Sequence, residues 1–73
     1  MIGYLKGVVV ACAPERVLLD VHGVGYDISI PLSTFYELEN VAPQQPVGLF
    51  VHTHVRQDAI ELFGFWNERE KLL

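Results

Sequence analysis

A chain of 73 residues supports one small domain, which buries only about 60% of the surface that its unfolded chain exposes. The composition is that of a globular protein: 51% of residues are hydrophobic, 11% aromatic and 19% charged, without the biased tracts of disordered chains. Five Lys and Arg against nine Asp and Glu give a net charge of −4, which argues against strong nucleic-acid binding by these residues alone.

Other features of the sequence argue against a membrane or secreted protein. No apolar run approaches the roughly 20 residues of a membrane span, and the N-terminal stretch lacks the small-residue cleavage site of a signal peptide. Cys12 is the only cysteine, so no internal disulfide can form. We therefore expect a cytoplasmic protein.

The first half of the chain predicts three strands. Residues 4–12 hold three consecutive valines before an Ala-Pro-Glu-Arg turn signal, and residues 16–22 place Val17, Leu19 and Val21 on one face of a strand. The two segments form a predicted hairpin. Gly23 and Gly25 indicate a tight turn or bulge before residues 26–30, where alternation predicts a strand with one buried face. A phosphate-binding loop at these glycines is the weaker alternative, because the spacing is wrong and no helix follows directly.

The spacing of the apolar residues then changes and predicts a short helix over residues 33–39. Thr34, followed three residues later by Glu37, resembles a capping box. Phe35 and Leu38 would face the core.

Two further strands are predicted at residues 47–55 and 59–65, after a loop that contains two prolines. The tip between them, residues 56–58, is charged and has no glycine or asparagine, which sharp hairpin turns often use. Residues 66–73 are helical in composition but too few to be stable alone. We expect them to begin a helix of a longer protein, and residues 1–65 to form the domain.

Five strands with one short helix between the third and fourth predict a mainly all-β fold. Such a set closes into a small barrel of five to six antiparallel strands. The position of the helix is that of the OB-fold. An SH3-like barrel has a similar strand count and stays open as an alternative.

Metal and catalytic sites are poorly supported. His52 and His54 lie two apart on a strand and share a face, but Cys12 and the distant His22 do not complete a tetrahedral ligand set. Cys12 lies among valines and alanines, as an unreactive thiol does, and no two carboxylates have a spacing that favours acid–base chemistry. We expect no metal, no cofactor and no catalytic residue.

The late aromatic residues Phe50, Phe63, Phe65 and Trp66 allow two interpretations. Exposed aromatics on an OB-fold can stack on single-stranded bases. Their alternating pattern instead predicts that most lie in the core, with Trp66 partly exposed or packed on the rest of a longer protein.

Several segments together resemble the N-terminal domain of the RuvA family, the Holliday-junction-binding subunits of the bacterial branch-migration machine. These segments are MIGYLKG, GVGYDISIP, FYEL, HTHVRQDAIELFGF and NEREK, and the resemblance covers essentially the whole chain in order. The resemblance implies a non-catalytic OB-fold domain that serves DNA recombination and repair. In the family it precedes a helix-hairpin-helix domain and a small domain that contacts the RuvB ATPase, both outside this sequence.

The resemblance further implies a homotetramer or octamer on which a four-way DNA junction lies flat. In the family an acidic pin, usually Arg-Glu-Asp and a small residue, lies at the junction crossover. The matching residues here are Arg56, Gln57, Asp58 and Ala59, so an amide replaces one pin carboxylate. The implied roles are phosphate pairing for Arg56 and phosphate repulsion for Asp58, with Lys6 a further candidate phosphate contact. An oligomerisation-only scaffold and a generic single-strand binder stay open as alternatives.

Overall fold

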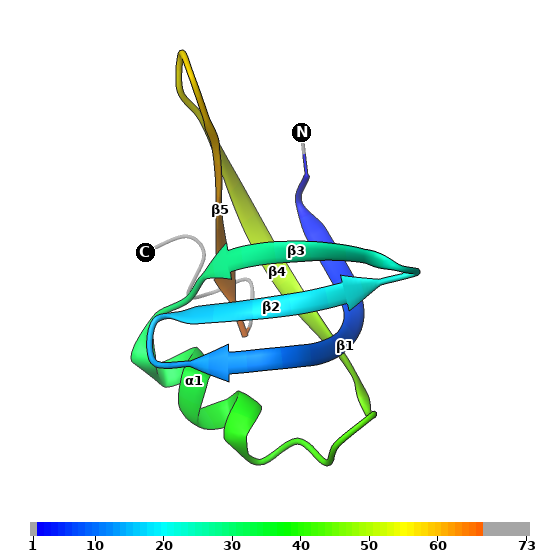
Figure 1. Ribbon diagram of the computed structural model, residues 1–73. Helices are drawn as coiled ribbons and strands as arrows, with labels where there is room; N and C mark the ends of the chain where they lie inside the picture. The colour runs from blue at the N-terminus through cyan, green and yellow to red at the C-terminus, as the bar shows by residue number, and fades with distance from the viewer. Residues whose placement is uncertain (1, 67–73) are drawn as a thin grey trace.

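The computed structural model describes residues 2–66, which contain five strands and one helix (Figure 1). The elements are β1 (Tyr4–Ala13), β2 (Arg16–Val21), β3 (Val24–Ser29), α1 (Leu32–Glu39), β4 (Pro46–Val55) and β5 (Ile60–Phe65). Their bounds fall within two residues of the predicted ranges. The predicted helical tail lies outside the described residues, except for Trp66.

The strands close into a barrel in the order β1-β2-β3-β5-β4, with β4 pairing back onto β1. This order, with α1 between β3 and β4, confirms the predicted OB-fold. One detail of the prediction is wrong: β3 and β5 pair in parallel, through Ile28 with Leu62 and Ser29 with Phe63. A closed ring with an odd number of strands cannot alternate direction all the way round, so one pair must be parallel.

Two tight turns join the first three strands. The β2–β3 turn has His22 at φ 52° and Gly23 at φ 89°, and positive φ at both central residues suits the twist of a hairpin. The Asp20 carboxylate accepts a hydrogen bond from the Gly23 N–H at 2.8 Å. The turn predicted at this glycine is therefore confirmed, whereas Gly25 lies within β3.

The core fills the barrel with aliphatic side chains that alternate along the strands. Leu19, Ile28 and Leu49 are fully buried. The other buried hydrophobic residues are Leu5, Val17, Ile30, Leu38, Val47, Val51 and Leu62. In Figure 1 α1 lies below the strands, and the β4–β5 hairpin rises on the opposite side.

The helix packs as predicted but starts differently. Leu38 is buried and Phe35 is half-buried against the core, which confirms the predicted inner face. The prediction of a capping box at Thr34 is wrong: Pro31 is the N-cap and forms no side-chain capping hydrogen bond. Thr34 is instead fully buried, where its Oγ1 accepts a hydrogen bond from the Trp66 N–H at 3.1 Å. The hydroxyl fixes the chain just after β5.

Candidate nucleic-acid interface

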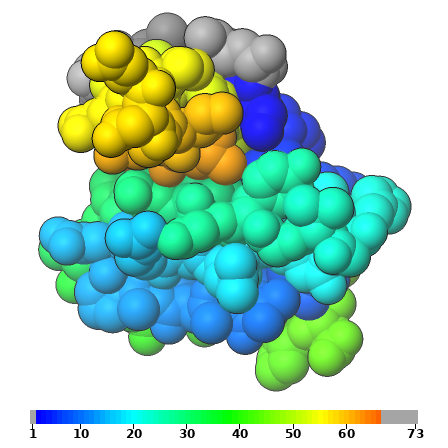
Figure 2. Space-filling model, turned by 45° about the horizontal axis from the view of Figure 1, so that its top comes forward, coloured from blue at the N-terminus to red at the C-terminus, as the bar shows by residue number. Residues whose placement is uncertain are grey.

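The β4–β5 hairpin extends beyond the barrel. Its antiparallel ladder runs from Phe50 paired with Phe65 to Val55 paired with Ile60. Every residue from 54 through 60 is exposed, including Val55 at 61% and Ile60 at 69% of their surface. In the space-filling view of Figure 2 the hairpin forms a yellow lobe above β3. This projecting segment contains three of the four predicted site residues.

The tip turns without a glycine. The Arg56 N–H donates a hydrogen bond to the Ala59 carbonyl at 2.7 Å, which leaves Gln57 and Asp58 at the outermost point. Among residues 2–66, positive φ angles occur elsewhere and at none of these four residues. The turn therefore does not need the glycine or asparagine that the sequence lacks here.

The Arg56 side chain folds back along the hairpin. Its Nε lies 3.7 Å from Glu61 Oε2, and both side chains are exposed. An exposed pair of this kind contributes between 0 and about 1 kcal/mol, because water and salt screen it. A phosphate can therefore replace Glu61 as the partner of Arg56 at little cost.

The base of the hairpin is anchored by the N-terminal residues. Thr53 Oγ1 donates a hydrogen bond to the Ile2 carbonyl at 2.7 Å, and the Val51 N–H donates one to the Gly3 carbonyl at 2.9 Å. The buried part of β4 is thus held on both sides, by β5 and by the start of the chain. Only the segment beyond Thr53 lacks this support.

Lys6, the fourth predicted site residue, lies away from the tip. It is exposed on β1 and pairs with Gly48 of β4. Val55 lies seven positions along the extended strand from Gly48, or about 23 Å. Lys6 and the tip therefore cannot contact the same phosphate.

The aromatic residues of β4 and β5 correct a prediction. Leu62 and Gly64 point into the barrel, so Phe63 and Phe65, one position away, point outward and are only half-buried. Phe50 is half-buried on the outside of β4 for the same reason. The expectation that most of these rings lie in the core is therefore wrong.

Gly64 is the residue in the sequence that marks the inward face of β5. A Cβ atom at this glycine would lie 2.7 Å from Ile28 Cγ2, so the inward position leaves no room for a larger side chain. Trp66 is partly exposed, as predicted, and it also packs against the core, which was not predicted.

The candidates for metal binding and catalysis are not assembled into a site. His52 and His54 are exposed on one face of β4, as predicted. No group of three His, Cys, Asp or Glu side chains that could hold a metal occurs in residues 2–66. Partial desolvation and, to a lesser extent, the Glu39 carboxylate raise the pKa of the exposed Cys12 thiol, which favours the unreactive protonated form. Within the same residues, no helix is long and apolar enough to cross a membrane.

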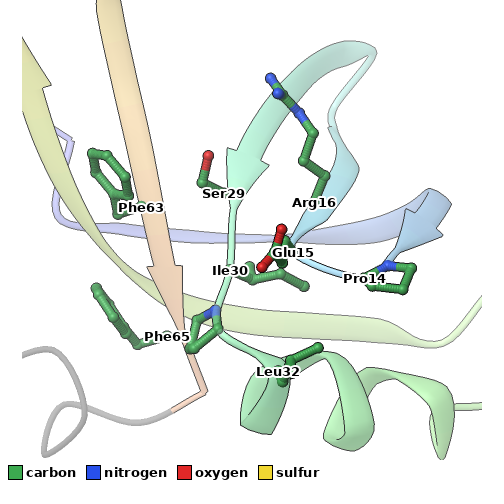
Figure 3. Close-up of a pocket in the computed structure, with 9 residues that line it drawn as sticks. Pro14, Glu15, Arg16, Ser29, Ile30, Leu32, Phe63 and Phe65 are labelled. Carbon is green, nitrogen blue, oxygen red and sulfur yellow. The ribbon is translucent and has the colours of Figure 1, made fainter.

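An open cavity of about 540 Å³ lies between the β1–β2 turn, the start of α1 and β5 (Figure 3). Phe63 and Phe65 border it from β5, and Leu32 borders it from the helix. Glu15 and Arg16 supply its charges, and the Arg16 guanidinium is bound to Asp27 through two hydrogen bonds of 3.0 and 2.6 Å. The cavity thus offers apolar walls with little free positive charge.

Comparison with known proteins gives a consistent result. The family model "RuvA N terminal domain" matches residues 1–64. The chain is 51% identical over 71 residues to the Holliday junction branch migration complex subunit RuvA of Syntrophobacter fumaroxidans, covering 97% of this chain and 35% of that protein. It is 49% identical over 73 residues to the protein of the same name in Coxiella burnetii, covering 100% of this chain and 36% of that protein.

A third relative, the RuvA subunit of Legionella pneumophila strain Corby, is 46% identical over 74 aligned positions, again with 36% of that protein covered. The chain therefore spans about a third of the length of the relatives that it matches. The barrel topology, the projecting hairpin and these matches lead to one conclusion: the chain belongs to the RuvA N-terminal domain family.

Proposed function

We propose that this chain is the non-catalytic OB-fold domain of a Holliday-junction-binding subunit, and that it places the β4–β5 hairpin at the crossover of a four-way DNA junction. The observation that carries the proposal is the hairpin itself. It projects from the barrel with Arg56, Gln57 and Asp58 at its outer end. The relatives that cover the whole chain are named as junction branch-migration subunits, which supports the same role.

The chemistry of the tip suits a wedge between DNA strands. A carboxylate near phosphates is unfavourable to both, and more so where protein and DNA exclude water. Asp58 at the outermost point would repel the phosphates of the crossover and favour strand separation. Arg56, whose present partner Glu61 is exposed and easily exchanged, would bind a phosphate beside the tip and position the hairpin.

Gln57 adjusts the strength of this repulsion. It places an amide beside Asp58 where the family usually has a glutamate, so each copy carries one negative charge fewer at the tip. In a four-fold assembly the effect is multiplied around the axis. The hairpin would then separate strands mainly by its bulk, and the protein would hold junctions more tightly than a glutamate variant.

The remaining functions of the complex would lie outside this domain. We assign backbone binding to a following helix-hairpin-helix domain, contact with the RuvB ATPase to a C-terminal domain, and ATP hydrolysis to RuvB. The homotetramer or octamer is part of the same proposal. The net charge of −4 supports this division, because a strong grip on phosphates needs more cations than this chain offers.

The test is Gln57→Glu in the full-length protein, with four-way junction affinity and branch-migration rate as readouts. We expect binding weaker by at least about fivefold, since one unit-charge contact at 4 Å in water is worth roughly 1 kcal/mol and a four-fold assembly repeats it. Gln45→Glu is the matched control, because it adds the same charge to the loop before β4. Equal affinity and equal migration rate for Gln57→Glu and the unchanged protein would refute the charge repulsion proposed for the tip.

A further inference from the structure

The outer surface of β1, β4 and β5 gathers aromatic and basic side chains in cross-strand rows. Tyr4 pairs with Phe50, which in turn pairs with Phe65, and the next row joins His52 to Phe63. We call this surface the β1–β4–β5 face. Its aromatic residues are Tyr4, Phe50, Phe63 and Phe65, and its basic residues are Lys6, His52, His54 and Arg56.

The rings of this face lie on the outside of the barrel, with Tyr4 exposed and Phe50, Phe63 and Phe65 partly buried. Tyr4 is 51% exposed, lies over Gly48 and meets Phe50 edge to face with ring centroids 5.3 Å apart. Figure 3 shows the Phe63 and Phe65 rings side by side on the same side of β5. Outward-facing rings on a sheet surface provide platforms that any nucleobase can stack on where their faces are open to solvent.

Charge is distributed unevenly between this face and the rest of the chain. Seven of the nine carboxylates belong to residues 2–66, and only Glu61 lies on the face. The other six are on the β1–β2 turn, β2, β3, α1 and the hairpin tip: Glu15, Asp20, Asp27, Glu37, Glu39 and Asp58. Of the three described lysines and arginines, Lys6 and Arg56 lie on the face, whereas Arg16 is bound to Asp27. Counted together, the face and the hairpin tip carry two cations and two carboxylates, whereas the rest of the described residues carry one cation and five carboxylates, so this surface is the least unfavourable one for a polyanion.

We propose that the β1–β4–β5 face binds an unpaired DNA strand as it leaves the hairpin tip. The inference rests on the proposed function, which places separated strands at that tip. Arg56 and Lys6 would neutralise phosphates at the two ends of the face, about 23 Å apart along β4, and the rings between them would stack on bases. A duplex hides its base faces, so the rings favour a single strand.

The test is a titration of the 73-residue chain with a 12-nucleotide oligothymidine at low salt, followed by amide NMR shifts and fluorescence anisotropy. We expect weak binding with shifts at Lys6, His52 and Phe63. Two neutralised phosphates predict a slope of log affinity against log salt of about −1.4. Lys6→Gln should reduce that slope by about 0.7.

Substitution of a ring separates stacking from charge. Phe63→Leu should weaken binding by roughly tenfold, the loss of one stacked base, with the amide spectrum showing that the barrel is intact. Tyr36→Leu is the matched control, because Tyr36 is 59% exposed but lies on α1, away from the face. It should bind oligothymidine like the unchanged chain.

Several outcomes would overturn the inference: no binding, shifts confined to other surfaces, or Phe63→Leu and Lys6→Gln both indistinguishable from the unchanged chain. Concentration-dependent shifts of the face without DNA would assign it instead to contact with a second copy. If oligothymidine does not bind the face but the full-length protein still binds four-way junctions, the proposed function is unaffected. Absence of a Gln57→Glu effect on junction binding would count against the charge repulsion in the proposed function, independently of the oligothymidine result.

Discussion

The barrel and the hairpin tip are built from the same two strands but under different constraints. Below the Thr53–Leu62 pair, every second residue of β4 is buried, and Leu49 and Val51 make no more than 1% of their surface accessible. Above that pair both faces of the hairpin are exposed. Packing therefore determines the residues of the lower half, whereas the upper half is free to carry charge for contact with a ligand.

The two regions should also differ in stability. The barrel is closed, so none of its five strands is an edge, and its core is continuous. The tip has one described backbone hydrogen bond, from Arg56 to Ala59, and one exposed ion pair. Segments with few buried contacts open locally at low free energy, so we expect the tip to exchange its amide hydrogens long before the barrel unfolds.

The largest effect should come from truncation in the barrel. Leu49→Ala removes a fully buried side chain and should lower the free energy of unfolding by about 2–5 kcal/mol. Val55→Ala, on the same strand but exposed, should change it by no more than about 0.5 kcal/mol. Urea unfolding of both variants measures the difference. Similar losses would show that the hairpin is packed against something and that the two regions are not distinct.

A smaller effect should come from the contact between α1 and the end of β5. Thr34→Val keeps the side-chain volume but removes the oxygen that accepts from the Trp66 N–H, which should cost about 1–3 kcal/mol. Tryptophan fluorescence follows the unfolding directly, because Trp66 is the single tryptophan. An unchanged unfolding midpoint would mean that water or another group satisfies this N–H equally well.

The smallest effect should come from the surface ion pair of the barrel. Hydrogen bonds from Arg16 lower the pKa of Asp27 from its usual value of 3.8. The folded state therefore favours the carboxylate, and the contribution to stability is complete above pH 3.8 and lost as the pH falls through the lowered pKa. Asp27→Asn should remove this acid-dependent part and change little at pH 7, since both side chains are more than half exposed. A large loss at pH 7 would contradict this.

The sequence predicted the elements of the fold well, because turn residues and alternation are local signals. It predicted the hairpin and the composition of its tip for the same reason. It marked the buried face of β5 only weakly, because Leu62 and Phe63 are both apolar, and the close approach of Ile28 to Gly64 shows why the Leu62 face is the inner one. It also assigned Thr34 to a local cap, because its contact with Trp66 joins residues 32 apart in the chain.

The separation of Lys6 from the tip was equally hidden from the sequence. Both residues were candidate phosphate contacts, and only the β1–β4 register shows that they share a face but lie at opposite ends of it. Long-range pairing of this kind depends on how the barrel closes. Neither residue type nor spacing reports it.

The central claim is that the hairpin tip lies at the crossover of a bound junction. The most direct measurement places a photo-crosslinking residue at position 57 of the full-length protein and maps its products on a four-way junction. We expect crosslinks confined to the few nucleotides around the crossover, on all four strands. Crosslinks spread along the duplex arms, or none to DNA at all, would contradict it.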